Sequence, residues 1–196
     1  MSAPSRLKTE IIVETERLLL RTEAPGDRTV WLKHMNNDAV MAHLGGPVPS
    51  DRVHESFRRR AEGWAKHGFS FMMLERRNDR CLIGHCGLST IDTHEAPAAL
   101  RGQPQIGWAL REDAWGQGYA REAAQAVLAL AFGRFGITTL FGQTSQGNRA
   151  SWGLMEKLGM SRRADLDYVD TDYPPQDNPT MVYQLTREAW LARIRG

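Results

Sequence analysis

The sequence predicts one α/β domain of the α+β kind: a mixed, mostly antiparallel sheet of about seven strands flanked by about four helices. Three observations lead to this prediction. A chain of 196 residues suits a single large domain with its own apolar core. The strand-like segments come mostly in consecutive runs, with a single strand–helix–strand–helix unit near 105–159. The sequence shows no internal repeat or low-complexity tract, which would indicate another architecture.

The first half of the chain predicts three strands and two helices. Residues 16–22 place three leucines between charged flanks, as in a first strand, and Asp27 then caps a helix. A Gly-Gly-Pro break follows, and a second helix covers 50–66 before ending at a glycine. Segments 69–76 and 81–90 are two strands joined by an Asn-Asp turn, the pattern of a hairpin.

The second half continues with alternating strands and helices. Small and apolar residues recur every three to four positions over 121–132, which predicts a long helix. Asn148 caps a further helix that ends at Gly159. A polar loop separates the last two strands. The strands expected here are 105–111, 137–144, 161–169 and 181–185.

Composition excludes several classes of protein. The chain is 41% hydrophobic and 24% charged, with 25 basic and 23 acidic residues and a net charge of +2. Such a balance argues against a general nucleic-acid or membrane binder. The polar segment 1–8 lacks the apolar stretch of a secretory signal, so we expect a flexible tail over 1–10 and one domain over 11–196. No apolar run has the length of a membrane span.

The cysteines indicate a reduced compartment. Cys81 and Cys86 are the two cysteines of the chain and lie five residues apart in one strand-like segment. Their side chains should therefore point to opposite faces and should not bond each other. We expect a cytoplasmic protein. The six histidines show no metal-binding spacing, and no metal is expected.

The run 115–120 (Trp-Gly-Gln-Gly-Tyr-Ala) is the main functional signal. It joins a strand to a helix, so its glycines leave backbone N–H groups free at the positive end of that helix. Phosphate is the usual ligand of such a turn. A Walker loop would need Gly-Lys-Ser/Thr, and the chain has Gly-Tyr-Ala instead. A dinucleotide fingerprint would need a third glycine where Arg121 stands, and an acidic residue near 140.

A third scheme fits. The pattern Trp115-x-x-Gly118-x-Ala120 resembles the acyl-CoA-binding loop of the GNAT superfamily of N-acetyltransferases, with Trp where the superfamily often has Arg or Gln. A second block, Asn148-x-x-Ser151 followed by Glu-Lys-Leu-Gly-Met, is similar to the family's next helix. The stretch 106–110 (Ile-Gly-Trp-Ala-Leu) followed by 115–123 (Trp-Gly-Gln-Gly-Tyr-Ala-Arg-Glu-Ala) looks like the RimJ/RimL-type branch, which acetylates the N-termini of ribosomal proteins. A weaker match is Arg-Leu-Leu-Leu-Arg at 17–21.

The resemblance implies direct acetyl transfer from acetyl-CoA, the co-substrate, to a primary amine. The turn amides would hold the pyrophosphate, the strand before them would pair with the pantetheine arm, and one of its N–H groups would stabilise the oxyanion. The residues implied in binding are Trp108, Ala109, Leu110, Trp115, Gly116, Gln117, Gly118, Tyr119, Ala120, Asn148 and Ser151.

The catalytic residues are less well marked. Many family members place a tyrosine seven residues after the asparagine to protonate the leaving thiolate, whereas this chain has Met155. The catalytic candidates on that helix are Asn148 and Ser151, which has the nearest hydroxyl, and a thiolate can leave without a strong acid. The base candidates that could act directly are His85 and Glu75, each equally compatible with a structural role.

The acceptor is indicated only by class. Segment 164–179 holds five aspartates, two tyrosines and no Lys or Arg, which could concentrate a cationic amine or simply form a solvated loop. We expect acetyl-CoA and an amine as partners, and a monomer or homodimer. Two other functions stay open: a non-catalytic acyl-CoA-binding module, and a basic interaction module using Arg58-Arg59-Arg60.

Overall fold

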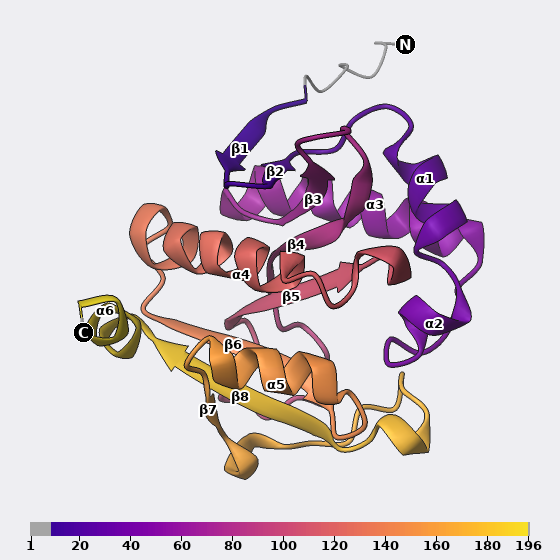
Figure 1. The fold of residues 1–196 in the computed structure, drawn as a ribbon. Helices are drawn as coiled ribbons and strands as arrows, with labels where there is room; N and C mark the ends of the chain where they lie inside the picture. The colour runs from indigo at the N-terminus through magenta and orange to yellow at the C-terminus, as the bar shows by residue number, and fades with distance from the viewer. Residues whose placement is uncertain (1–8, 196) are drawn as a thin grey trace.

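One eight-stranded sheet organises the computed structural model, which describes residues 9–195 (Figure 1). Most of the tail predicted over 1–10 lies outside the described residues. The strand order is β1-β2-β3-β4-β5-β6-β8-β7. The strands are β1 (Ile11–Glu14), β2 (Leu18–Arg21), β3 (Phe71–Arg76), β4 (Leu82–Thr90), β5 (Pro104–Leu110), β6 (Thr139–Ser145), β7 (Ser161–Arg162) and β8 (Thr180–Thr186).

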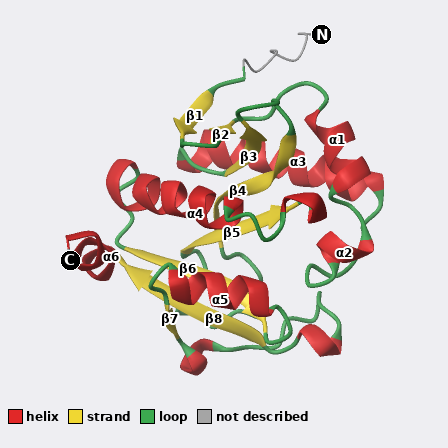
Figure 2. Cartoon of the chain, viewed as in Figure 1, coloured by secondary structure: helices red, strands yellow, loops and turns green. Residues whose placement is uncertain are grey.

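Helices cover both faces of this sheet (Figure 2). They are α1 (Asp27–His34), α2 (Asp38–Met41), α3 (Ser50–His67), α4 (Tyr119–Ala129), α5 (Arg149–Lys157) and α6 (Arg187–Arg195). Met73 of β3 packs in an apolar cluster with α1 and α3, and the next residue, Leu74, packs in the cluster of α4 and α5. Because successive strand residues point to opposite faces, α1 and α3 lie on one face and α4 and α5 on the other.

The sheet divides between β5 and β6. Every other neighbouring pair is antiparallel, whereas β5 and β6 run parallel and pair only at Gln105–Phe141 and Ile106–Gly142. Beyond these positions the two strands diverge, as Figure 1 shows. The predicted mixed, mostly antiparallel sheet is confirmed, and its parallel pair creates a gap in the middle of the sheet.

The prediction of a strand over 161–169 was wrong beyond Arg162. A 3-10 turn covers Ala164–Leu166 instead. Arg162 forms an ion pair with Asp167, and an Asp167 carboxylate oxygen accepts a hydrogen bond from Val182 N at 3.1 Å. A side chain thus takes the place of a backbone ladder bond, and the strand ends.

The N-terminal half also differs in detail. Asp27 is the first residue of α1 rather than its cap, which is Gly26, because the Asp27 carboxylate is paired with Arg21. The strand β1 and the helices α2 and α6 were not predicted. Both cysteines are free, as expected. In the described part of the chain, no helix is long and apolar enough to cross a membrane.

Candidate active site in the β5–β6 gap

The glycine turn leaves a row of backbone donors without acceptors. Gly116 and Gly118 have φ values of +70° and +82°, a conformation that favours glycine. Within residues 9–195, the N–H groups from Gly116 to Arg121 have no hydrogen-bond acceptor. The last three belong to the first turn of α4, where no helical carbonyl precedes them. These donors and the helix dipole together form an anion site.

The side chain of Arg17 holds this turn through contacts with Gln117, Tyr119 and Glu122. Its Nη1 donates to the carbonyl oxygen of Gln117 at 2.9 Å, and its Nε donates to Glu122 at 2.6 Å. The guanidinium also lies 4.5 Å from the centre of the Tyr119 ring. Arg17 thus takes up the carbonyl oxygen of Gln117, whereas the N–H groups of the turn stay available to a ligand. The sequence predicted for Arg17 only a weak family match. Its position before an apolar strand and the acidic Glu122 in the first turn of α4 are the signals that could have indicated this pair.

Strand β5 has an unpaired edge toward the gap. Arg111 N donates to Ile83 O of β4 at 2.8 Å. In an antiparallel ladder these bonds alternate, so the backbone groups of Ala109 face β4 and those of Trp108 and Leu110 face the gap. The Leu110 carbonyl accepts from the Trp115 indole N–H at 2.8 Å. The N–H groups of Trp108 and Leu110 are therefore directed where the thioester was predicted.

A cleft of about 1520 Å³ passes through the gap and joins the two faces of the sheet. Its walls include every residue predicted to bind the co-substrate except Gln117, whose side chain donates to Asp113 O at 2.8 Å. The predicted residues that line the cleft are Trp108, Ala109, Leu110, Trp115, Gly116, Gly118, Tyr119, Ala120, Asn148 and Ser151.

The start of α5 forms the wall opposite β5. Asn148 caps this helix, as predicted, because its side chain accepts from Ser151 N at 3.2 Å. The Ser151 side chain lies on the same wall. Met155 is 2% exposed and packs over Gly142 of β6, so it belongs to the core and supplies no proton. A role for Ser151 at the leaving thiolate stays a prediction.

His85 lies in the cleft as a hydrogen-bond donor. Its Nδ1 is 3.3 Å from the indole nitrogen of Trp31, whose N–H can only donate, so Nδ1 accepts and the neutral ring carries its proton on Nε2. Burial holds the pKa of His85 well below its ordinary value, and the charge of Arg60 acts in the same direction. The predicted role of His85 as base is not favoured by this geometry.

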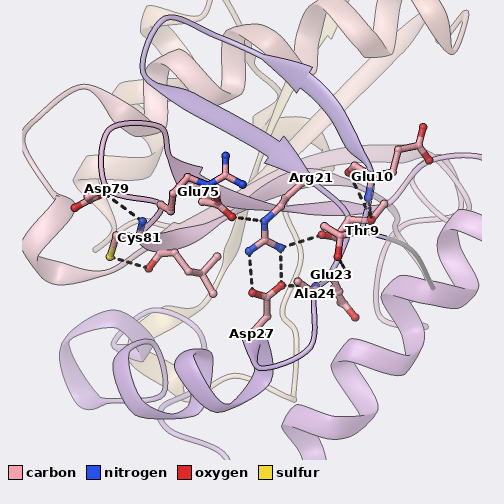
Figure 3. Close-up of polar contacts among 12 residues, drawn as sticks. Thr9, Glu10, Arg21, Glu23, Ala24, Asp27, Glu75, Asp79 and Cys81 are labelled. Carbon is pink, nitrogen blue, oxygen red and sulfur yellow. Dashed lines mark hydrogen bonds and ion pairs between the residues drawn. The ribbon is translucent and has the colours of Figure 1, made fainter. Parts of the chain in front are cut away.

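Glu75 does not line the cleft. Its carboxylate lies against Arg21 instead (Figure 3). Its carboxylate accepts from Arg21 Nε at 2.6 Å and also contacts Arg80. Arg21 in turn donates to both oxygens of Asp27, at 2.7 and 2.9 Å. Arg21, Asp27 and Glu75 are all buried. Each buried charge has a partner of opposite sign within this group, which offsets the cost of removing it from water. This geometry favours a structural role for Glu75.

The acidic segment faces the other end of the cleft. Asp165 and Asp167 are paired with Arg163 and Arg162 and do not line it. The remaining aspartates and both tyrosines do: Tyr168, Asp170, Asp172, Tyr173 and Asp177. Burial raises the pKa of Asp170 and of Tyr173, and neighbouring carboxylates act in the same direction. A cation bound here would relieve that repulsion.

The arginine run on α3 forms no continuous basic patch. Arg58 is paired with Glu55 and Glu62 on the same helix. Arg60 is only 7% exposed, and its guanidinium lies 4.8 Å from the centre of the Phe57 ring. These contacts weaken the interpretation of this helix as a nucleic-acid-binding surface.

A model of a protein family, the acetyltransferase (GNAT) domain, matches residues 17–161. The chain belongs to the GNAT acetyltransferase family. Members of this family take their acetyl group from acetyl-CoA, so the predicted family, fold, enzyme class and co-substrate are confirmed. The cleft is therefore the candidate active site of this acetyltransferase domain.

Individual relatives agree with this assignment. Over 111 residues the chain is 31% identical to the FsC-acetyl coenzyme A-N(2)-transacetylase of Aspergillus fumigatus; the match covers 56% of this chain and 47% of that one, about half its length. An acetyltransferase from Agrobacterium tumefaciens is 26% identical with a TM-score of 0.72, over 94% of this chain and 98% of that one. A RimL ribosomal α-N-protein acetyltransferase, 15% identical with a TM-score of 0.70 over 94% and 98%, shares the fold.

Proposed function

We propose that this GNAT domain acetylates a cationic primary amine, either a protein N-terminus or a small molecule, by direct attack on the thioester of acetyl-CoA. One observation carries the proposal: the unpaired amides of residues 116–121 and the unpaired edge of β5 line one continuous cleft. The sequence at 106–110 and 115–123, which resembles the RimJ/RimL-type branch, supports a protein N-terminus as one of the two acceptor classes.

The donor half of the cleft fits an acyl-CoA. The turn amides offer several N–H donors to a diphosphate, with Gly118 giving the backbone close access. The Trp108 and Leu110 edge can pair with an extended amide-containing arm as an added strand would. One of these two N–H groups then stabilises the oxyanion on the thioester carbonyl.

The acceptor half fits a cation. Asp170, Asp172 and Asp177 line the cleft together with Tyr168 and Tyr173, and burial and all three carboxylates raise the pKa of Tyr173. Carboxylates with aromatic neighbours attract an ammonium group and raise its local concentration. The amine loses one proton before attack, which an α-amino group with a pKa of about 8 does more readily than a lysine-like amine with a pKa of about 10.4.

Incubation with acetyl-CoA and a panel of primary amines and N-terminal peptides tests the proposal, with the acetylated product detected by mass. We expect turnover of at least one cationic amine and release of free CoA. Tight binding of CoA by calorimetry with no transfer to any acceptor would instead support the non-catalytic CoA-binding module. Absence of CoA binding would refute the assignment of the turn.

A further inference from the structure

His43 follows α2 and reaches across the acceptor half of the cleft to the far end of the sheet. Its Nδ1 lies 3.1 Å from Asp177 Oδ1 and 3.4 Å from Ser145 Oγ at the end of β6. The His43 side chain is 37% exposed and lines the cleft, whereas the Asp177 side chain is 3% exposed. A half-exposed imidazole is thus held by a buried carboxylate.

This contact sets the protonation of the ring. An ionised carboxylate offers only lone pairs, so Nδ1 of His43 must be the donor to Asp177. In the neutral ring Nε2 then has the free lone pair and can accept a proton. His85 has the opposite arrangement, because the Trp31 indole donates to its Nδ1. Of these two cleft histidines, His43 is the one prepared to act as a base at Nε2.

Along the strand direction, His43 lies at the same level as the backbone N–H groups of β5 that face the gap. Ile106 of β5 pairs with Gly142 of β6, so Ser145 is level with Ala109, beside the two N–H groups directed at the thioester. Gly142 faces Met155 of α5, and alternation turns Ser145 to the opposite face, toward α1 and α3. His43 therefore meets the gap from the face opposite α4 and the glycine turn.

We propose that His43 is the general base of the acetyl transfer and that Asp177 is its positioning residue; this rests on the function proposed above. His43 Nε2 takes a proton from the acceptor ammonium, and the amine lone pair attacks the thioester carbon. The carbon–sulfur bond then breaks, and the thiolate takes the second amine proton to give free CoA and the amide. The buried Asp177 carboxylate stabilises the imidazolium until it releases its proton to water.

Other groups share this end of the cleft and enter any pH dependence. Asp177 is the nearest carboxylate. The other charged or titratable cleft residues of the acidic segment and the start of α5 are Tyr168, Asp170, Asp172, Tyr173 and Arg149. Asp177 is changed only in the Asp177→Asn variant; the other groups are the same in His43→Gln and wild type, so their own titration enters both pH profiles.

The test compares His43→Gln with wild type across pH, using the panel acceptor that wild type acetylates fastest. We expect kcat to fall by about 10²–10⁴ near pH 7. The loss should shrink as pH rises toward the pKa of the acceptor amine, since a neutral amine needs no base. Added imidazole should restore part of the rate of His43→Ala. Asp177→Asn should lower kcat by a smaller factor than His43→Gln, with little change in the KM of acetyl-CoA.

The matched control is His54→Gln, an exposed histidine of α3 outside the cleft, which should keep the wild-type kcat at every pH. Calorimetry with CoA should give the same Kd for His43→Gln and wild type, which shows that the fold is intact. A wild-type pH profile in His43→Gln, or a loss equal at all pH values and not relieved by imidazole, would overturn the role of His43. No turnover by wild type would instead overturn the proposed function.

Discussion

Replacement of Glu75 by glutamine separates a structural from a catalytic role for this residue. Glu75 is 5% exposed, and its Oε2 accepts from Arg21 Nε at 2.6 Å. In Glu75→Gln the amide oxygen can still accept that hydrogen bond, and Arg21 keeps both bonds to Asp27. The change therefore keeps the hydrogen bond to Arg21 but removes the ion pair with Arg80, because the side-chain NH2 replaces the oxygen that contacts Arg80.

The expected cost follows from the difference between two kinds of hydrogen bond. A bond to a charged group contributes about 1.5–3 kcal/mol and a neutral one about 0.5–1.5 kcal/mol. Glu75→Gln should therefore lower the free energy of unfolding by about 1–2 kcal/mol. For a chain of this size that corresponds to a Tm about 2–8 °C lower.

Thermal unfolding and steady-state kinetics on the same preparation provide the assay. Because Glu75 does not line the cleft, kcat at a temperature well below Tm should equal that of wild type. Glu14→Gln, at a carboxylate that is 54% exposed, should change neither quantity and serves as the control. An unchanged Tm with kcat reduced a hundredfold would refute this reasoning and make Glu75 the base.

Three further predictions concern the turn, the acceptor and the pH dependence of stability. Gly118→Val, at φ +82° and close to Arg17, should raise the Kd of CoA at least about tenfold by calorimetry, whereas Gly133→Ala, where a Cβ meets open space, should not. Asp172→Asn should raise the acceptor KM about two- to tenfold at low salt, with kcat unchanged, and Asp165→Asn should not; equal KM values would remove the steering role. Burial raises the pKa of Glu23 from its ordinary value of 4.5 to about 7, so the folded state holds this proton where the unfolded state loses it. The free energy of unfolding should therefore fall between pH 4.5 and 7, by at most about 3 kcal/mol, and Glu23→Gln should remove this fall in urea titrations.

The sequence predicts the elements around the gap well because their signals are local. Glycines at positive φ, an Asn helix cap and periodic apolar residues each constrain a few neighbouring positions, so the turn at 115–120 and the cap at Asn148 are predicted correctly. Asp27 shows the limit of this reasoning. It has the chemistry of a helix cap, but a buried arginine six residues earlier pairs with it, and the helix begins without its side chain.

The base was harder to find for the same reason. His43 and Asp177 are 134 residues apart, and neither has a neighbour in sequence that signals a dyad. His85 was the more visible histidine because it lies in a predicted strand, yet its protonation depends on Trp31, 54 residues away. Side-chain contacts across the sheet decide which nitrogen of each ring is free, and no local pattern contains them.

The position of the active site follows from the one parallel pair of the sheet. A crossover through α4 joins the parallel strands β5 and β6, and α5 follows β6, so the N-termini of both helices lie at the carboxyl ends of these strands. Because the strands diverge there, backbone donors of the glycine turn, the free edge of β5 and the capped start of α5 all face one gap. The antiparallel neighbours β4 and β8 hold β5 and β6, the two strands that border the gap, in place. The cleft through the gap opens toward α4 on one face and toward His43 and Asp177 on the other, which lets donor and acceptor approach the thioester from opposite sides.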